Sequence, residues 1–198
     1  MAIIVDKVQK RKDIALSCTA LFIEHGIKDL TISKVAKTAG VGKGTIYDYF
    51  ENKEDIVFEI VNILMHEHNE IKKKRLSTAT STKEKIKLFF GFFYEEQDTE
   101  LRTLYKEFIS ISLVSPNEKM IDFQTECFES YYQWFEQILQ EGIDKGEIIS
   151  ESLHFAKGLF ATAEGLFIAS IATRAIPDIQ KELDLYIDTL FTLIEEKK

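Results

Sequence analysis

The spacing of apolar and polar residues predicts helices along almost the whole chain. Between Val8 and His25, apolar side chains recur at the three- and four-residue steps of a buried helical face. Gly26 follows, and a glycine in this position commonly ends a helix. The only two prolines, Pro116 and Pro177, both lie where a helix boundary is expected. The pattern therefore predicts an all-α fold.

Two short helices with a tight turn between them are expected next. Thr31 is placed to cap the first, ISKVAKTA, whose Ile32, Val35, Ala36 and Ala39 face inward. The segment AGVG then breaks the chain before the second short helix, KGTIYDY. Two helices joined in this way form a helix-turn-helix, in which the second helix enters the major groove of DNA.

Further helices in the rest of the chain bring the predicted total to about nine. Ser81 and Ser115 each precede a glutamate three positions on, which is the capping-box pattern of a helix start. We expect a three-helix domain at residues 1–53 and a larger helical domain at residues 54–198. The predicted bounds are Glu51 or Asn52 to Leu76, Ser81 to a weak break at Asp98-Thr99, that break to the segment SPNE, Ser115 to Gly142 or Gly146, Ser150 to Ala175, and Asp178 to the end.

Composition indicates an ordinary globular protein with a real core, since 45% of its 198 residues are apolar. The longest nearly uncharged apolar stretch, residues 158–173, is interrupted by Glu164 and is shorter than a membrane-spanning helix requires. The N-terminus lacks the pattern of a secretory signal. Cys18 and Cys127 are isolated, which suits reduced thiols. We therefore expect a cytoplasmic protein with no membrane partner.

Charge is distributed unevenly between the two predicted domains. Residues 1–53 carry nine basic and six acidic side chains, a net charge of +3. Residues 54–198 carry sixteen basic and twenty-seven acidic side chains, a net charge of −11. A basic head on an acidic body favours a nucleic-acid partner for the head alone.

The second short helix has one face suited to DNA. At 100° per residue, Phe50 falls on the same buried side as Ile46, whereas Gly44, Thr45, Tyr47 and Asp48 point outward. Threonine and tyrosine hydroxyls beside Lys43 can donate hydrogen bonds to phosphates and base edges. A three-helix bundle that binds protein is the alternative, although a packing helix would not gather these polar residues on one side.

This N-terminal region, IALSCTALFIEHG followed by TISKVAKTAGVGKGTIYDYFENKEDI, is similar to the DNA-binding domain of the TetR family of bacterial transcriptional regulators. The resemblance covers roughly residues 8–60. It implies contacts with DNA phosphates and bases, and a small-molecule sensor domain behind the DNA-binding domain. By this resemblance the DNA-contacting residues are Thr31, Ser33, Lys43, Gly44, Thr45, Tyr47, Asp48, Tyr49 and Lys53.

The sequence departs from the family's pattern at Gly42, where a Ser or Thr cap is common, so a phosphate-binding hydroxyl is missing there. Asp48 is unusual because phosphates repel an acid. It is expected either to accept a hydrogen bond from cytosine or to pair with Lys43. The basic residues of the N-terminal segment form either a DNA-contacting arm or a solvated terminus; they are Lys7, Lys10, Arg11 and Lys12.

Aromatic residues are concentrated in the larger domain, where thirteen of the chain's twenty-three lie between Ile86 and Phe135. Their surplus over one core face per helix indicates the wall of an effector cavity, although large core residues are the simpler interpretation of most. Six acids and no basic residue lie between Met120 and Asp144, which indicates either a cationic or amphipathic effector or a solvated helix face. The candidate ligand-binding residues are Phe89, Phe93, Tyr105, Phe108, Phe128, Tyr131, Trp134 and Phe135.

The last two predicted helices indicate a homodimer. Small residues at three- and four-residue steps allow close approach of helices, and the final helix carries another apolar stripe. Together they would expose too much apolar surface in a monomer, so we expect a two-fold four-helix interface and a palindromic operator. Glu164 is expected to pair with a group such as Arg174 across this interface, or to contact ligand. The candidate interface residues are Gly158, Thr162, Gly165, Ala169, Tyr186 and Leu190.

No catalytic set, cofactor motif or metal site is evident. His66 and His68 are two residues apart, which splays them on a helix, and GVGKGT lacks the spacing of a phosphate-binding loop. The sequence therefore predicts a ligand-responsive DNA-binding regulator, and a repressor in particular, rather than an enzyme. The alternatives are a helical adaptor that binds protein and a DNA-binding regulator without a small-molecule ligand.

Overall fold

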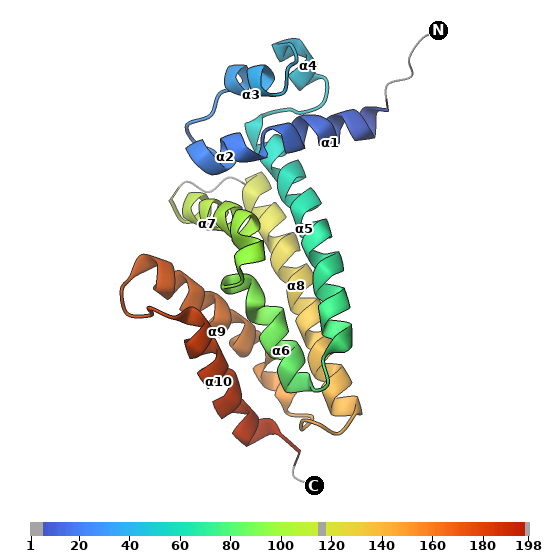
Figure 1. The fold of residues 1–198 in the computed structure, drawn as a ribbon, viewed down its shortest axis with the longest axis vertical. Coiled ribbons are helices and arrows are strands. Elements are labelled where there is room, and N and C mark those ends of the chain that lie inside the picture. The colour runs from blue at the N-terminus through green and yellow to red at the C-terminus, as the bar shows by residue number, and fades with distance from the viewer. Residues whose placement is uncertain (1–5, 115–117, 197–198) are drawn as a thin grey trace. The chain divides into compact units, whose positions relative to one another are not determined.

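A computed structural model describes residues 6–114 and 118–196. Within these ranges the chain forms ten α-helices and two short 3-10 helices and no β-strand, with one isolated bridge between Ile148 and Glu195 (Figure 1). The all-α prediction is confirmed. The predicted helix start at Ser115 and Pro116 lies outside the described residues.

The N-terminal helices are α1 (Lys7–Ser17), α2 (Thr19–His25), α3 (Ile32–Thr38) and α4 (Lys43–Tyr47). The single helix predicted from Val8 to His25 is thus wrong in one respect, since it is divided at Cys18. The Ser17 hydroxyl bonds the carbonyl of Ile14, and the Cys18 N–H bonds Ala15, so the helical hydrogen-bond pattern is interrupted.

The turns around α3 and α4 follow the sequence pattern. Gly26 has φ 69° and Gly40 has φ 66°, in the region that favours glycine. Thr31 caps α3, since its hydroxyl accepts a hydrogen bond from the Lys34 N–H. Gly42 is the N-cap residue of α4, with no side-chain cap. The predicted helix-turn-helix is therefore present.

The middle of the chain forms α5 (Lys53–Thr78), α6 (Thr82–Phe90), the 3-10 helices η1 (Gly91–Phe93) and η2 (Glu96–Asp98), and α7 (Thr99–Val114). The helix predicted to run on from Ser81 to Asp98 ends earlier, because the chain tightens into 3-10 geometry at Gly91. Ser81 caps α6 through the Glu84 N–H at 3.2 Å. The Glu84 carboxylate accepts from the Thr80 N–H instead of completing a box with Ser81.

The remaining helices are α8 (Glu118–Asp144), α9 (Ser152–Ala172) and α10 (Ile179–Ile194). Asp178 caps α10 by accepting a hydrogen bond of 3.0 Å from the Lys181 N–H. Helix α10 packs against both α6 and α9. These helices agree with the predicted ones to within a few residues, apart from the predicted start of α8, which lies outside the described residues.

The chain divides into two compact units, and α5 and α8 each contribute residues to both. The first unit contains the residues up to His68 together with Glu100–Phe123. The second contains Asn69–Thr99 together with the residues from Gln124 onward. This division concerns packing alone, so the functional boundary expected between residues 53 and 54 stays a prediction.

Each unit has its own apolar core. In the first, Ile14, Phe22 and Ile46 are fully buried. A stack of three rings also belongs to it, with centroids of Phe58 at 5.7 Å from Phe108 and 4.7 Å from Phe123. The core of the second unit is formed mainly by rings and branched side chains from α6, α8, α9 and α10; examples are Ile86, Phe90, Phe135, Phe160, Ile187 and Phe191.

Candidate nucleic-acid interface and effector site

Helix α4 separates buried from exposed residues as its sequence predicts. Ile46 is fully buried and Phe50, just beyond the helix, is 2% exposed. Tyr47 is 59% exposed, Gly44 and Asp48 are exposed, and only Thr45 is half-buried. We call the exposed face formed by Lys43, Gly44, Thr45, Tyr47 and Asp48 the recognition face.

Gly44 leaves open space on the recognition face. A Cβ atom built at this position would meet no atom within 4 Å. The absence of a side chain is therefore not required by packing within the chain. It would instead allow the backbone of α4 to approach another molecule closely.

The other predicted DNA-contacting residues lie around α3 and the start of α5. Thr31 and Ser33 are exposed at the N-terminal end of α3, and Tyr49 is half-buried. Lys53 is engaged within the chain, because its ammonium group donates to the carbonyls of Lys28 at 2.8 Å and Leu30 at 3.2 Å. These bonds tie the start of α5 to the loop before α3.

Asp48 occupies the C-cap position of α4, where its backbone N–H bonds the Gly44 carbonyl at 3.1 Å. Within residues 6–114 and 118–196, no ion pair joins its carboxylate to Lys43. The pairing considered from the sequence is therefore absent here. Contact with a base remains the prediction for Asp48.

The basic residues before α2 do not behave alike. Lys7 and Lys12 are exposed and Lys10 is half-buried. Arg11 is different, since its guanidinium bonds Glu59 and the Tyr49 carbonyl and lies over the ring of Phe50. From the sequence, these residues are expected to form either a DNA-contacting arm or a solvated terminus. The contacts of Arg11 match neither role.

Six of the eight candidate ligand-binding residues gather in the second unit. We call this group, with two further rings, the aromatic cluster. Phe89 lies 5.5 Å from both Trp134 and Phe135, between ring centroids. Phe160 of α9 lies 5.1 Å from Phe128. The cluster consists of Phe89, Phe90, Phe93, Phe128, Tyr131, Trp134, Phe135 and Phe160.

Sequence reasoning missed Phe90 and Phe160 and included two residues that lie elsewhere. Tyr105 and Phe108 belong to the first unit, where Phe108 stacks on Phe123 at 5.6 Å. Phe160 lies on α9, the helix whose small residues indicate the dimer interface in the sequence. Its position two turns before Phe167, on the side of α9 that is buried, was the available signal.

A buried lysine lies against the aromatic cluster. Lys72 is 4% exposed, and its Nζ donates to the Phe89 carbonyl at 2.6 Å and lies 5.4 Å from the centre of the Phe89 ring. Burial lowers the pKa of Lys72 to about 8, and the nearby carboxylates of Asp98 and Glu95 oppose this effect. Glu95 itself forms a paired hydrogen bond with Arg75. Nothing in the sequence distinguishes this lysine, which stands in the run KKKR.

The acids between Met120 and Asp144 lie on a solvated face of α8. Asp122, Glu126, Glu129, Glu141 and Asp144 are exposed, and only Glu136 is half-buried. The carboxylate of Glu136 accepts a hydrogen bond of 2.6 Å from Tyr132. These acids therefore follow the solvated-face interpretation and not that of a charged cavity wall.

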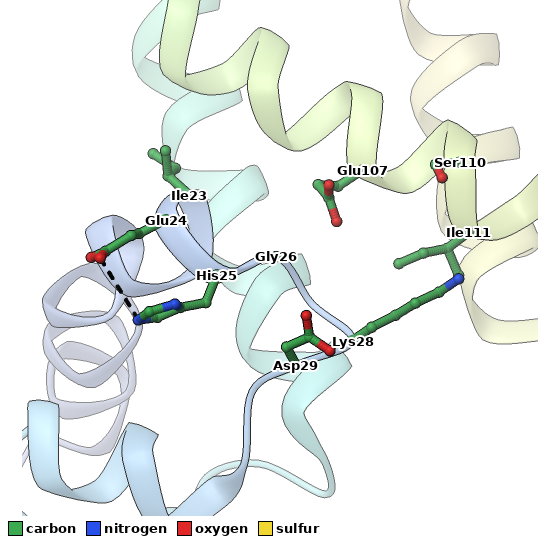
Figure 2. Close-up of a pocket in the computed structure, with 9 residues that line it drawn as sticks. All are labelled: Ile23, Glu24, His25, Gly26, Lys28, Asp29, Glu107, Ser110 and Ile111. Atoms are coloured by element: carbon green, nitrogen blue, oxygen red, sulfur yellow. Dashed lines mark ion pairs between the residues drawn. The ribbon is translucent and has the colours of Figure 1, made fainter.

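A cleft of about 380 Å³ lies in the first unit, between the end of α2 and α7. Figure 2 shows Glu107 of α7 and Asp29 pointing into it, with the long side chain of Lys28 beside them. Its lining is largely polar, with Ile23 and Ile111 as the apolar exceptions. This cleft is unsuited to a hydrophobic effector, and sequence reasoning did not anticipate it.

The small residues of α9 form a stripe that is partly exposed; they are Gly158, Thr162, Gly165 and Ala169. Gly158 and Gly165 are exposed, and a Cβ atom built at either would meet no atom within 4 Å. Thr162, Ala169 and Leu190 are half-buried, and Tyr186 is 38% exposed. Large exposed apolar side chains flank the stripe on α9 and α10; they are Phe155, Ile168, Ile171, Leu185 and Leu193.

By length and composition alone, α9 is also apolar enough to cross a membrane, and it is the one such helix among the described residues. The core helix of a soluble protein passes the same test. In the described parts of the chain, no group of three or more His, Cys, Asp or Glu side chains is arranged to hold a metal ion. His66 is exposed and His68 is buried.

Comparisons with known proteins agree with this geometry. Residues 18–60 match the family of bacterial regulatory proteins, tetR family. The chain is 31% identical over 144 residues to the fatty acid metabolism regulator protein of Bacillus subtilis, an alignment that spans 72% of each chain.

Solved structures share the fold over nearly the whole chain. A TetR-family transcriptional regulator from Cytophaga hutchinsonii superposes with a TM-score of 0.80 at 16% identity, covering 98% of this chain and 99% of the other. The fatty acid degradation regulator FadR from Bacillus halodurans gives a TM-score of 0.70 at 24% identity, covering 92% and 94%. The chain therefore belongs to the tetR family of bacterial regulatory proteins and is a DNA-binding transcriptional regulator, not an enzyme.

Proposed function

We propose that this regulator is a homodimeric repressor that a small hydrophobic or amphipathic effector releases from a palindromic operator. The observation that carries this proposal is the recognition face of α4. It exposes Tyr47 while Ile46 is fully buried, so the hydroxyl and backbone are presented on a helix whose opposite side packs into the core. The protein acts where the DNA is, in the cytoplasm.

The DNA contacts follow from the position of each group. Helix α4 enters the major groove, where Thr45 and Asp48 face base edges and Tyr47 contacts a phosphate. Lys43 and Thr31, exposed at the N-terminal ends of α4 and α3, add phosphate contacts. The excess of basic residues in this part of the chain favours such an approach.

The effector site centres on the aromatic cluster. Phe128, Tyr131 and Trp134 are half-buried, whereas the rings behind them are buried. Aromatic walls with a few polar groups are typical of pockets for apolar or amphipathic molecules, and Lys72 and Tyr131 supply polar groups here. The relative that is a fatty acid metabolism regulator supports an effector with a long apolar part.

The dimer is proposed to form through α9 and α10. Glycines at positions 158 and 165 let two copies of α9 approach closely, and the flanking apolar side chains become buried. A two-fold dimer presents two recognition faces to two half-sites, so the operator is palindromic. Glu164 is proposed to lie near this interface.

Release is proposed to work by a shift between two states of the dimer. An effector that binds one state more tightly shifts the population toward it. If the distance between the two recognition faces in that state does not match the spacing of the two half-sites, the dimer releases the operator. Helix α5, which contributes to both units, is the proposed link between them.

The test begins with selection of bound fragments from genomic DNA by the full-length protein. A palindrome that is bound in a salt-dependent manner, and not by Tyr47→Ala, supports DNA binding through α4 and excludes the adaptor alternative. Compounds are then screened for release of that DNA. Trp134, the chain's one tryptophan, provides a fluorescence signal for binding at the cluster.

A regulator without an effector is the second candidate, and the packing of the cluster favours it. Phe89, Phe90, Phe135 and Phe160 are between 0% and 6% exposed, as in a solid core. If no member of a panel of fatty acids, lipids, dyes and apolar drugs changes Trp134 fluorescence or releases DNA, this second candidate replaces the first.

A further inference from the structure

The side chain of Arg11 on α1 joins three elements of the DNA-binding region. Its Nε donates a hydrogen bond of 2.8 Å to Oε2 of Glu59 on α5. Its Nη1 donates to the backbone carbonyl of Tyr49, two residues beyond the end of α4. Its Cζ lies 4.2 Å from the centre of the Phe50 ring, which is within the range of a cation–π interaction. Arg11 therefore links α1, the end of α4 and α5.

Helix α4 buries little of its own side-chain surface, although it packs against α3. It is five residues long, too short to be stable by itself in water, and Ile46 is its one buried residue. Gly42 provides no side-chain cap at its N-terminal end. At its C-terminal end the chain continues to Phe50, which is 2% exposed and packed beneath Arg11. The contacts of Arg11 thus add side-chain restraints to the C-terminal end of α4, where the N–H groups of Tyr49 and Phe50 already bond the Ile46 carbonyl.

These contacts leave Arg11 poorly placed to act as a phosphate ligand. One face of the guanidinium covers Phe50, and two of its N–H groups are used within the chain. The side chain is 34% exposed. Glu59 also compensates its charge at close range. A residue that serves as a phosphate contact would instead present an unpaired guanidinium to solvent, as exposed Lys12 presents its ammonium.

We propose that Arg11 is a positioning residue for operator recognition, which acts by fixing the orientation of α4 through Tyr49, Phe50 and Glu59. The proposal rests on the recognition face proposed above and is independent of any effector. Loss of Arg11 leaves the phosphate contacts in place but lets α4 adopt several orientations, few of which fit the groove. Specific binding then weakens, while non-specific binding changes little.

The variant Glu59→Gln distinguishes a positioning role of Arg11 from a direct contact of Arg11 with a DNA phosphate. If Arg11 were a phosphate contact, Glu59→Gln would remove a nearby negative charge and would strengthen or preserve DNA binding. If Arg11 positions α4, Glu59→Gln removes its partner and weakens specific binding. The two accounts therefore predict opposite signs for the same variant.

The experiment measures affinity for the selected operator and for unrelated DNA, over a series of salt concentrations. The full-length variants are Arg11→Ala, Arg11→Lys and Glu59→Gln, with Lys12→Ala as the matched loss of a charge from the same helix. Thermal melting followed by circular dichroism identifies a temperature for these measurements at which every variant is folded. Tyr47→Ala is measured in parallel to test the recognition face itself.

Positioning predicts that Arg11→Ala and Arg11→Lys each lower operator affinity roughly tenfold, as expected for loss of a cation–π interaction and a charged hydrogen bond. Glu59→Gln also lowers operator affinity, and all three variants reduce the ratio of specific to non-specific affinity. The slope of log affinity against log salt stays that of the wild type. Lys12→Ala leaves the ratio unchanged.

The proposal is overturned if Arg11→Ala reduces the salt slope by about 0.9, the value for one phosphate that is no longer neutralised, while Arg11→Lys binds as the wild type does. It is also overturned if Glu59→Gln binds the operator as tightly as the wild type or more tightly. If Tyr47→Ala retains full affinity, the recognition face is wrong. If Tyr47→Ala binds weakly and the Arg11 variants bind normally, only the positioning role is wrong.

Discussion

The ammonium group of Lys72 donates a hydrogen bond to the backbone carbonyl of Phe89, and this bond places a buried cation against the aromatic cluster. The carbonyl belongs to the last turn of α6, just before the chain changes to 3-10 geometry at Gly91. The Lys72 side chain therefore supplies a hydrogen-bond donor to a carbonyl in the last turn of α6, where carbonyls lack intrahelical partners.

This arrangement predicts that stability rises with pH in an alkaline window. Burial lowers the pKa of Lys72 from its ordinary value of 10.5 to about 8, so between these values the unfolded chain binds more protons than the folded one. The cost of burying the charge is fully present below pH 8 and is relieved as the pH rises toward 10.5.

We expect the free energy of unfolding of the wild type, relative to Lys72→Met, to increase by up to about 3 kcal/mol across this window. Urea denaturation at several pH values measures it. Lys73→Met, at a neighbouring lysine whose side chain is 61% exposed, is the control and should show no such trend. A constant difference between wild type and Lys72→Met would mean that Lys72 titrates normally.

Gly26→Ala should destabilise the protein. Gly26 has φ 69° and ψ 169°, a conformation almost restricted to glycine, and an added Cβ would lie 3.0 Å from Oε2 of Glu107. We expect a loss of roughly 1–3 kcal/mol in unfolding free energy, measured by thermal or urea denaturation. Gly26→Ala in a Glu107→Ala background should recover only the part due to the steric contact. Wild-type stability for the single variant would contradict the backbone geometry.

Gly44→Ala should weaken DNA binding without lowering the stability of the fold. The position is helical, and a Cβ atom there meets nothing within 4 Å, so stability should be unchanged or rise by up to about 1 kcal/mol. Operator affinity should fall, because the added methyl group stands between the backbone of α4 and the DNA. The two quantities are measured by denaturation and by fluorescence anisotropy with labelled operator. Undiminished affinity would show that α4 does not approach DNA at Gly44.

Gly165→Leu should disrupt the dimer without unfolding the protomer. A Cβ atom built at Gly165 would meet no atom of the described residues within 4 Å, so we expect the added side chain to be tolerated until a second α9 approaches. Analytical ultracentrifugation should show monomers at concentrations where the wild type is dimeric. Lys74→Leu adds the same side chain at an exposed position outside the stripe and should remain dimeric. A dimeric Gly165→Leu variant would place the interface elsewhere.

The parts of the fold that could be predicted from the sequence depend on local chemistry. The caps at Thr31 and Ser81 could be predicted because a side chain bonds a backbone N–H within three residues. The inward and outward sides of α4 were found because helical periodicity is fixed. The break at Cys18 was missed, since it depends on a single shifted hydrogen bond.

The parts that were missed depend on partners distant in the sequence. Arg11 contacts Glu59, forty-eight positions away, and in the sequence it is one more basic residue in a charged segment. Lys72 is buried and bonds the carbonyl of Phe89, seventeen positions away. The cluster includes Phe160 and excludes Phe108 for the same reason: periodicity gives a buried side to a helix but does not say which rings meet there.

Binding of the selected operator by wild type and Tyr47→Ala, measured side by side over a range of salt concentrations, tests the central claim most directly. The account predicts salt-dependent, sequence-specific binding by the wild type and a loss of about tenfold or more in Tyr47→Ala, with both proteins melting at the same temperature. Equal affinity of the two proteins for the operator would show that DNA is not bound through the recognition face of α4.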